Sequence, residues 1–256
     1  MIALRMIGEG QTPDAYVLGK MIMEYALKYG VHITILIDLL EFPLFFYLYQ
    51  KDRKYSFFPD MKFQKWTSKK AGYMVLVSVS AAHLGNLFVS ILVAVFPRLY
   101  SNYDKVNAIE KNAGFGFLFI AAVIVAPILE ETIFRGVIYG RARDLFGVKK
   151  AMFLSAFLFG LYHMNAVQFL YAGLLGFVLA WLYEVTGSLT GSVFGHMIAN
   201  AYVTIRGETS SLDWMFNSLI GFVLSTAVFT FLLIVGMHEL AQMQSRQEND
   251  MFELKL

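Results

Sequence analysis

The sequence predicts an all-α, polytopic integral membrane protein, a helix bundle with about seven to eight transmembrane helices. Of its 256 residues, 57% are hydrophobic and only 16% are charged, and the mean hydropathy is +0.57. Soluble domains carry roughly 25% charged residues. Several apolar runs reach the roughly 20 residues that span a bilayer as a helix. The alternating segments of a membrane β-barrel are absent, so the spans are helical.

The amino-terminal part is expected to reach the membrane within the first fifty residues. Residues 1–30 are mixed in character and predict an interfacial helix or an extension of the first span. That span is predicted at Val31–Tyr49, and its acids Asp38 and Glu41 are expected to face a neighbouring helix or water. The segment Lys51–Lys70 carries seven basic and two acidic residues, which favours a cytoplasmic loop.

The second span is predicted at Gly72–Phe96. Its polar residues His83 and Asn86 are interpreted as hydrogen-bonding partners between helices rather than as ligands. The loop Pro97–Asn112 contains few basic residues and is expected to be external. The third span follows, from Ala113 to about Arg143.

Further spans follow after short connections and complete one membrane domain at 31–240, before a polar tail at 241–256. They are predicted at Ala151–His163, Ala166–Tyr183, Ser188–Ile205 and Trp214 to about Met237. The charge bias of the loops places the amino terminus outside and the carboxyl terminus in the cytoplasm, with a bacterial cell membrane as the expected location.

Small residues recur every four positions in two of these spans and allow helix backbones to approach closely. The two stripes are Ala172, Gly176 and Ala180, and Gly187, Gly191, Gly195 and Ala199. We interpret them as packing features. They serve contacts within one chain or between chains equally well, so the sequence leaves the oligomeric state open.

The third span contains the strongest functional signal. Residues 115–129 carry no charge, and then Glu130, Glu131 and Arg135 follow within six residues. Ionisable side chains at membrane depth are costly and by default indicate a functional site. Glu131 and Arg135 are four residues apart and can pair along one helix face. Glu130 points about 100° away from Glu131 and is predicted to be the working carboxylate. Pro127 should loosen the helix and free carbonyl groups beside it.

Two histidines and an asparagine on other spans are predicted to lie at the same depth. His196 and Asn200 share a helix face because they are four residues apart. At ~1.5 Å per residue, Glu130 and His163 lie ~16 and ~20 Å from the cytoplasmic ends of their helices, and His196 and Asn200 ~12 and ~18 Å. Unrelated structural polar groups have no reason to share one layer.

These groups match the chemistry of peptide-bond hydrolysis. A carboxylate and an imidazole in a largely dry cavity suit general-base activation of water, and a second imidazole with an amide can donate hydrogen bonds to a developing oxyanion. The chain has no cysteine, which excludes a thiol nucleophile and thiolate metal sites. Its net charge of +2 is too small to suggest nucleic acid as a partner.

Three motifs resemble those of the CPBP family, which comprises CAAX-processing proteases and bacteriocin-processing or self-immunity (Abi) proteins. They are Glu-Glu-x-x-x-Arg from Glu130 to Arg135, Phe-x-x-x-His from Phe159 to His163, and His-x-x-x-Asn from His196 to Asn200. The resemblance covers a motif core at 113–206, and every motif position is intact.

The resemblance implies a glutamate-dependent intramembrane endopeptidase without a cofactor. It implies that Glu130 with His163 activates the water, that His196 with Asn200 forms the oxyanion hole, and that Glu131 with Arg135 holds the site's geometry. The implied partners are the bilayer and a peptide or membrane-protein substrate.

Two other hypotheses remain open. Glu130, His163 and His196 form a plausible ligand set for zinc with an open position for water, as in a membrane metalloprotease. Alternatively, the protein is a non-catalytic membrane adaptor or bacteriocin-immunity protein. Metal dependence separates the first hypothesis from the CPBP mechanism, and a Glu130→Ala variant separates the second.

Overall fold

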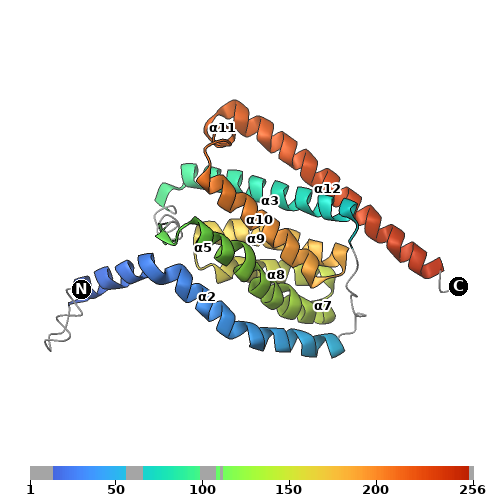
Figure 1. Cartoon of the computed structure of the whole chain (residues 1–256). Coiled ribbons are helices and arrows are strands. Elements are labelled where there is room, and N and C mark those ends of the chain that lie inside the picture. Colours follow the sequence, from blue (N-terminus) through green and yellow to red (C-terminus); the bar gives the residue numbers. More distant parts are fainter. Residues whose placement is uncertain (1–13, 56–65, 99–107, 110–111, 254–256) are drawn as a thin grey trace.

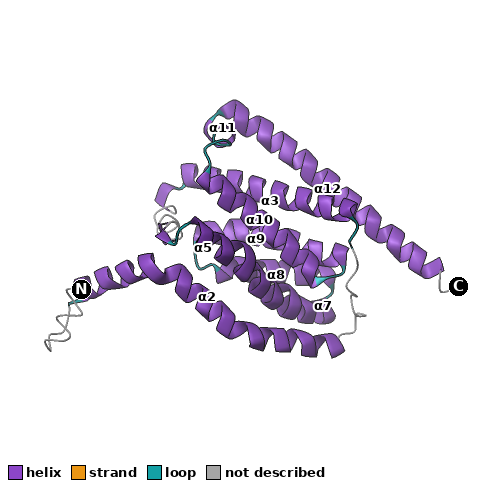
Figure 2. Cartoon of the chain, viewed as in Figure 1, coloured by secondary structure: helices purple, strands orange, loops and turns teal. Residues whose placement is uncertain are grey.

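The computed structural model describes residues 14–55, 66–98, 108–109 and 112–253, and the elements in this part of the chain are helical (Figure 2). The predicted all-α membrane bundle is therefore confirmed. Within these described ranges, five helical stretches are long and apolar enough to cross a membrane. They are Ala15–Lys54, Ser68–Val95, Phe115–Phe146, Ala166–Thr186 and Leu219–Arg246.

The number of such stretches is smaller than the seven to eight spans predicted. The predicted spans at Ala151–His163 and Ser188–Ile205 correspond to α8 (Val148–Tyr162) and α10 (Leu189–Glu208). Helix α8 has 15 residues and is ~22 Å long, shorter than the ~30 Å hydrocarbon layer. Helix α10 is long enough, but the polar site residues described below make it less apolar than these five stretches.

The helices form a bundle with the amino-terminal helix at one edge and the carboxyl-terminal helix at the other (Figure 1). Helix α3 (Ser68–Val95) contacts α10 and α12 (Leu219–Glu253), and α8 pairs with α9 (Ala166–Thr186) as an antiparallel hairpin. The amino-terminal helix α2 (Ala15–Tyr55) lies outside this group, against the third span.

Helix α2 is continuous through the region predicted as an interfacial helix or an extension, while residues 1–13 lie outside the described part. Only 6% of the residues in the most apolar 18-residue stretch of this helix are buried. Its inward stripe includes Asp38, Phe42, Phe45 and Tyr49, of which Asp38 and Tyr49 are buried. Gly136 permits this contact, because a Cβ there would lie 2.9 Å from Cδ2 of Tyr49.

The third span is divided into five segments around the two glutamates. They are α5 (Phe115–Phe119), the π-helical η1 (Ile120–Val125), α6 (Ala126–Glu131), the π-helical η2 (Thr132–Tyr139) and α7 (Gly140–Phe146). Such π-helical turns are rare and frequently occur at functional sites. Here they flank α6, whose last two residues are Glu130 and Glu131.

Side-chain caps begin the two helices that complete the site. The Asn165 side chain accepts from the N–H groups of Val167 and Gln168 at the start of α9. Gly187 ends α9 with a left-handed φ of 65°, and the Ser188 hydroxyl then caps α10. Glycine accepts this φ without steric cost, so the chain reverses tightly and α10 packs back against α9.

The carboxyl-terminal region differs from the prediction. Trp214–Asn217 is a separate short helix, α11, because Ser218 is extended, with φ −119° and ψ 140°. Helix α12 then continues to Glu253, through most of the segment predicted as a polar tail. Alanine, glutamine, methionine, arginine and glutamate are good helix formers, so the polar sequence can extend the apolar helix.

Candidate active site

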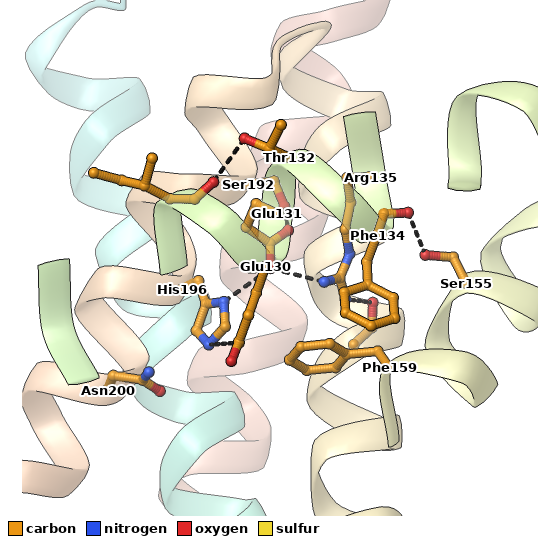
Figure 3. A network of polar contacts seen from close by, with 12 residues as sticks. Glu130, Glu131, Thr132, Phe134, Arg135, Ser155, Phe159, Ser192, His196 and Asn200 are labelled. Atoms are coloured by element: carbon orange, nitrogen blue, oxygen red, sulfur yellow. Dashed lines mark hydrogen bonds and ion pairs between the residues drawn. The ribbon is translucent and has the colours of Figure 1, made fainter. Parts of the chain in front are cut away.

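Glu131 is the most highly coordinated side chain of the site. It is fully buried, and its Oε1 accepts from Nη1 of Arg135 at 2.7 Å and from Nδ1 of His196 at 2.8 Å. Its other oxygen, Oε2, accepts from the Ser192 hydroxyl. Donors from η2 and α10 therefore converge on this carboxylate (Figure 3). A buried charge is tolerated when it is paired and hydrogen-bonded in this way.

Arg135 joins this carboxylate to α8 and α9. The guanidinium is fully buried, its Nη2 donates to the Gly176 carbonyl at 2.8 Å, and its Cζ lies 4.5 Å from the centre of the Phe159 ring. A Cβ at Gly176 would lie 3.1 Å from Nη2 of Arg135 and 2.9 Å from the Phe159 ring. The small-residue stripe of α9 therefore also admits the guanidinium to a backbone carbonyl.

Glu130 has a different environment from Glu131. Its side chain is 15% exposed, and its Oε2 lies 3.7 Å from Nε2 of His196, so the imidazole lies between the two glutamates (Figure 3). Among the described residues, the Glu130 side chain has no hydrogen-bond partner. Of the two adjacent carboxylates, Glu131 is thus fully occupied and Glu130 is the one with free acceptor positions.

His163 lies at the end of α8. Its Nδ1 is 2.9 Å from the Phe159 carbonyl oxygen, and its ring packs edge-on against the Phe159 ring at 5.0 Å. Met164 then takes a left-handed φ of 51°, which ends the helix before the Asn165 cap. His163 and His196 share one property, because in each ring Nδ1 is held by an acceptor. In the neutral tautomer that donates through Nδ1, an imidazole presents an unprotonated Nε2.

Asn200 is held by a carbonyl group that the third span leaves free. In η1 the N–H groups reach five residues back, and that of Ala126 bonds to Ala121. The next N–H in this register would reach Ala122, but residue 127 is proline and has no N–H. The Asn200 side chain donates to the Ala122 carbonyl at 2.8 Å instead. The expectation that Pro127 frees a carbonyl beside the site is confirmed.

The second π-helical segment is supported in a similar way. The Ser155 hydroxyl of α8 donates to the Phe134 carbonyl at 2.8 Å, and the Thr132 hydroxyl donates to the Ile128 carbonyl at 2.7 Å. Both serine and threonine are buried. These bonds fix the irregular backbone on the carboxyl-terminal side of the glutamates.

The structure brings four predicted residues into one cluster, namely Glu130, Glu131, Arg135 and His196. The Glu131–Arg135 pair forms as its spacing predicts. His196 was expected to act with Asn200, whereas it contacts both glutamates, and His163 was expected beside Glu130, whereas its hydrogen bond is to Phe159. The catalytic roles of all six residues remain predictions.

Two contributors to the cluster were not predicted, Ser192 and the Gly176 carbonyl. The position of Ser192 in the cluster could have been predicted from its spacing in the sequence. It stands four residues before His196 on α10, so Ser188, Ser192, His196 and Asn200 form one polar stripe along an otherwise apolar helix. The Gly176 carbonyl had none, because a backbone acceptor is present at every residue.

The donor set of the zinc hypothesis is not assembled in this conformation. Across residues 14–55, 66–98, 108–109 and 112–253, no three His, Cys, Asp or Glu side chains are grouped so that they could hold a metal ion. Glu130 and His196 are neighbours, while Nδ1 of His163 is directed to a backbone carbonyl. The zinc requirement remains a hypothesis for experiment.

Comparison with known proteins finds a family match over the segment that contains this site. Residues 112–202 match the family described as "Type II CAAX prenyl endopeptidase Rce1-like", and this segment contains all six predicted site residues. The chain is also 34% identical over 88 residues to the Bacillus subtilis protein named "Putative membrane peptidase YdiL". That alignment covers 34% of this chain and 36% of the relative, and no solved structure matches. The match over residues 112–202 agrees with the resemblance to the CPBP family that the three motifs predicted.

Proposed function

We propose that the protein is an intramembrane endopeptidase in which Glu130 activates water for attack on a peptide bond. The observation that carries this proposal is the contrast between the two carboxylates. Glu131 accepts hydrogen bonds from three side chains, whereas Glu130 has one long polar contact, 3.7 Å from His196. A general base needs an acceptor that the protein has not already occupied.

The reaction uses the groups of the cluster in turn. Glu130 takes a proton from water as the water oxygen bonds to the scissile carbonyl carbon. Nε2 of His196 lies next to Glu130 and can accept a second hydrogen bond from the same water, because Nδ1 is held by Glu131. The tetrahedral intermediate collapses when the C–N bond breaks, and the proton on Glu130 passes to the leaving amine.

The oxyanion requires donors in a fixed place. The Asn200 amide has two N–H groups, one of which is bonded to the Ala122 carbonyl. The other can donate to the carbonyl oxygen of the substrate. This assignment keeps Asn200 in the role that the family resemblance implies, while His196 takes part in water activation. His163, whose Nδ1 is held by the Phe159 carbonyl, would then act as a second base through its Nε2.

The decisive experiment is cleavage of a membrane-embedded peptide library by the purified, reconstituted protein. We expect Glu130→Gln to lower cleavage by about 10²- to 10⁴-fold, the usual contribution of a general base, with unchanged folding. Glu41→Gln is the matched control, because Glu41 is an exposed acid on α2 outside the cluster, and we expect it to cleave normally.

The same assay distinguishes the other hypotheses. Cleavage that a chelator abolishes and zinc restores would favour the metalloprotease. Absence of cleavage by the wild type, together with a cellular phenotype that survives Glu130→Ala, would favour an adaptor or immunity protein. We further propose an amino terminus outside and a carboxyl terminus in the cytoplasm, which cysteine labelling of residues introduced at the two ends would test.

A further inference from the structure

Two adjoining cavities lie against α3, α9 and α10, and they differ in polarity. The first, the polar cavity, has a volume of about 480 Å³, and its wall includes Asn86, Gln168 and Arg206. The second, the apolar cavity, has a volume of about 400 Å³ and is lined mostly by leucine, phenylalanine, valine and alanine side chains. The two cavities share Asn86, Tyr171 and Val203. One molecule with a polar part and an apolar part can therefore occupy both.

The order of the two cavities along the helices matches the layers of a membrane. Helix α9 begins at Ala166, and its residues line the polar cavity from Gln168 in its first turn. They line the apolar cavity as far as Val178, about ten residues or ~15 Å further along the helix. Helix α10 shows the same order, because Arg206 lies in its last turn and Ala199 lies deeper. The polar cavity is thus at the level of the helix ends, and the apolar cavity is at the level of the hydrocarbon layer.

The apolar cavity is accessible from the side of the bundle. Leu174 and Phe177 of α9 line it, and both side chains are exposed. Gly85 of α3 also lines it, and a Cβ at this position would meet no neighbouring helix within 4 Å. A hydrocarbon chain from the surrounding bilayer can therefore enter this cavity.

Arg206 is the cation of the polar cavity. Its Nη2 donates to Oδ1 of Asn86 at 3.5 Å, and its Nε is buried without a hydrogen-bond partner. Its Cζ lies 4.4 Å from the centre of the Phe216 ring, which covers one face of the guanidinium. Among the described residues, Arg206 forms no ion pair. A guanidinium has five N–H donors, so several remain for a phosphate, which arginine binds through two parallel hydrogen bonds.

Two acids, Glu208 and Asp213, stand at the exposed rim of the same cavity. Together with Arg206 they give its wall one positive and two negative charges, a net charge of −1. A ligand that carries only an anion would be attracted by the guanidinium and repelled by both carboxylates. A zwitterion with a phosphate and an ammonium group a few bonds apart complements the charges of both signs.

We propose that the two cavities together bind a phospholipid with an ethanolamine-type headgroup. The phosphate pairs with Arg206, the primary ammonium donates its N–H groups to the carboxylates at the rim, and one acyl chain fills the apolar cavity. Under the topology proposed above, this lipid comes from the outer leaflet. The inference goes beyond the proposed peptidase function, because the lipid is a bound ligand that is not cleaved.

Binding of lipids to the purified, delipidated protein tests the site, with native mass spectrometry as the measurement. The probes are phosphatidylethanolamine, phosphatidylcholine and phosphatidylglycerol with identical acyl chains. We expect phosphatidylethanolamine to bind about three- to tenfold more tightly than the others, a modest factor because the two carboxylates are exposed. Choline has no N–H donor, and the glycerol headgroup has no cation. Equal affinities, which indicate unselective surface contact, would overturn the inference, as would tighter binding of phosphatidylglycerol.

Variants of the charged residues test the two ends of the headgroup. Arg206→Gln should weaken the binding of phosphatidylethanolamine about tenfold. Arg141→Gln is the matched control, because Arg141 pairs with Asp52 outside both cavities, and it should bind like the wild type. The double variant Glu208→Gln, Asp213→Asn should bind phosphatidylethanolamine and phosphatidylglycerol equally. Wild-type affinity and selectivity in these variants would contradict the assignment of the headgroup.

A third variant tests the acyl chain and does not depend on the folding of Arg206→Gln. Gly85→Phe places a ring in the apolar cavity and should weaken phosphatidylethanolamine binding about tenfold or more. Gly72→Phe is its control, because Gly72 also lies on α3 with no neighbour within 4 Å but outside both cavities. Equal binding by the two variants would overturn the inference. Peptide cleavage without lipid selectivity would sink the lipid site alone, whereas lipid selectivity without cleavage would sink the peptidase proposal alone.

Discussion

Two arginines of the protein, the buried Arg135 and the half-buried Arg206, each lie over a phenylalanine ring, and they differ in what else they contact. Arg135 lies 4.5 Å from the Phe159 ring, pairs with Glu131 at 2.7 Å and donates to a backbone carbonyl at 2.8 Å. Arg206 lies 4.4 Å from the Phe216 ring and donates a hydrogen bond to the neutral side-chain amide of Asn86 at 3.5 Å. The first cation is neutralised by the protein, and the second is not.

This difference distinguishes a cation that the protein pairs with a buried carboxylate from one that, among the described residues, has no anionic partner. Removing one partner of a buried ion pair leaves the other uncompensated, which is strongly destabilising. Removing a cation that has no anionic partner leaves no such charge behind. Measurements of the stability of single variants therefore test this difference between the two arginines.

The largest effect is expected for Arg135→Met. The substitution leaves Glu131 buried without its cation and should lower the free energy of unfolding by about 3–5 kcal/mol, seen as loss of monodisperse protein and of the thermal transition in detergent. Arg206→Met is the matched control and should retain most of the folded yield. Equal losses in the two variants would mean that both arginines are structural.

A smaller loss is expected for Gly176→Ala. The new Cβ would meet the Phe159 ring at 2.9 Å and Nη2 of Arg135 at 3.1 Å, so the stacked pair must shift, at a cost of about 1–3 kcal/mol. Gly173→Ala on the same helix is the control, since its nearest neighbour is a carbonyl oxygen at 3.7 Å. A Gly176→Ala protein as stable as Gly173→Ala would contradict the close packing of α9 on Arg135.

Ser192→Ala should cost about 1–2 kcal/mol, because it removes one of the three donors to a buried carboxylate. It should also release the Glu131 side chain and so disturb His196, which Glu131 holds through Nδ1. We expect a lower cleavage rate with unchanged peptide affinity. A variant that loses affinity but keeps its rate would place Ser192 in substrate binding instead.

The smallest effect is expected at Arg141. It pairs with Asp52 at 2.7 Å, but the two side chains are 51% and 27% exposed. Exposed pairs contribute about 0–1 kcal/mol, so Arg141→Gln should melt within a few degrees of the wild type. It provides the baseline for loss of an arginine outside the bundle's interior.

The sequence predicted the fold class and the Glu131–Arg135 pair because both follow from local patterns. Apolar runs indicate membrane helices, and a four-residue spacing indicates a shared helix face. The pattern could not reveal that His196 lies between Glu130 and Glu131, because this depends on how α10 rotates against the third span. Depth along a helix can be estimated from the sequence, but rotation about its axis cannot.

The same limit explains why the number of spans differs from the prediction and why the surroundings of Arg206 could not be predicted. Helix α8 has the apolar sequence of a span but is only 15 residues long. The polar cavity beside Arg206 on α10 forms only after four helices and a turn have packed together. A basic residue near a helix end reads as an interfacial charge. Only the packing shows that Arg206 faces a cavity without an acid paired to it.

The free carbonyl of Ala122 has a consequence for how this site can change during evolution. Replacing Pro127 with any other residue restores an N–H that can occupy the carbonyl, and Asn200 then loses the acceptor that orients it. Replacing Asn200 with an apolar residue strands that carbonyl in the membrane interior. The two substitutions together should therefore destabilise the fold by less than the sum of their separate effects, although positions 127 and 200 lie on different helices and are 73 residues apart in the chain.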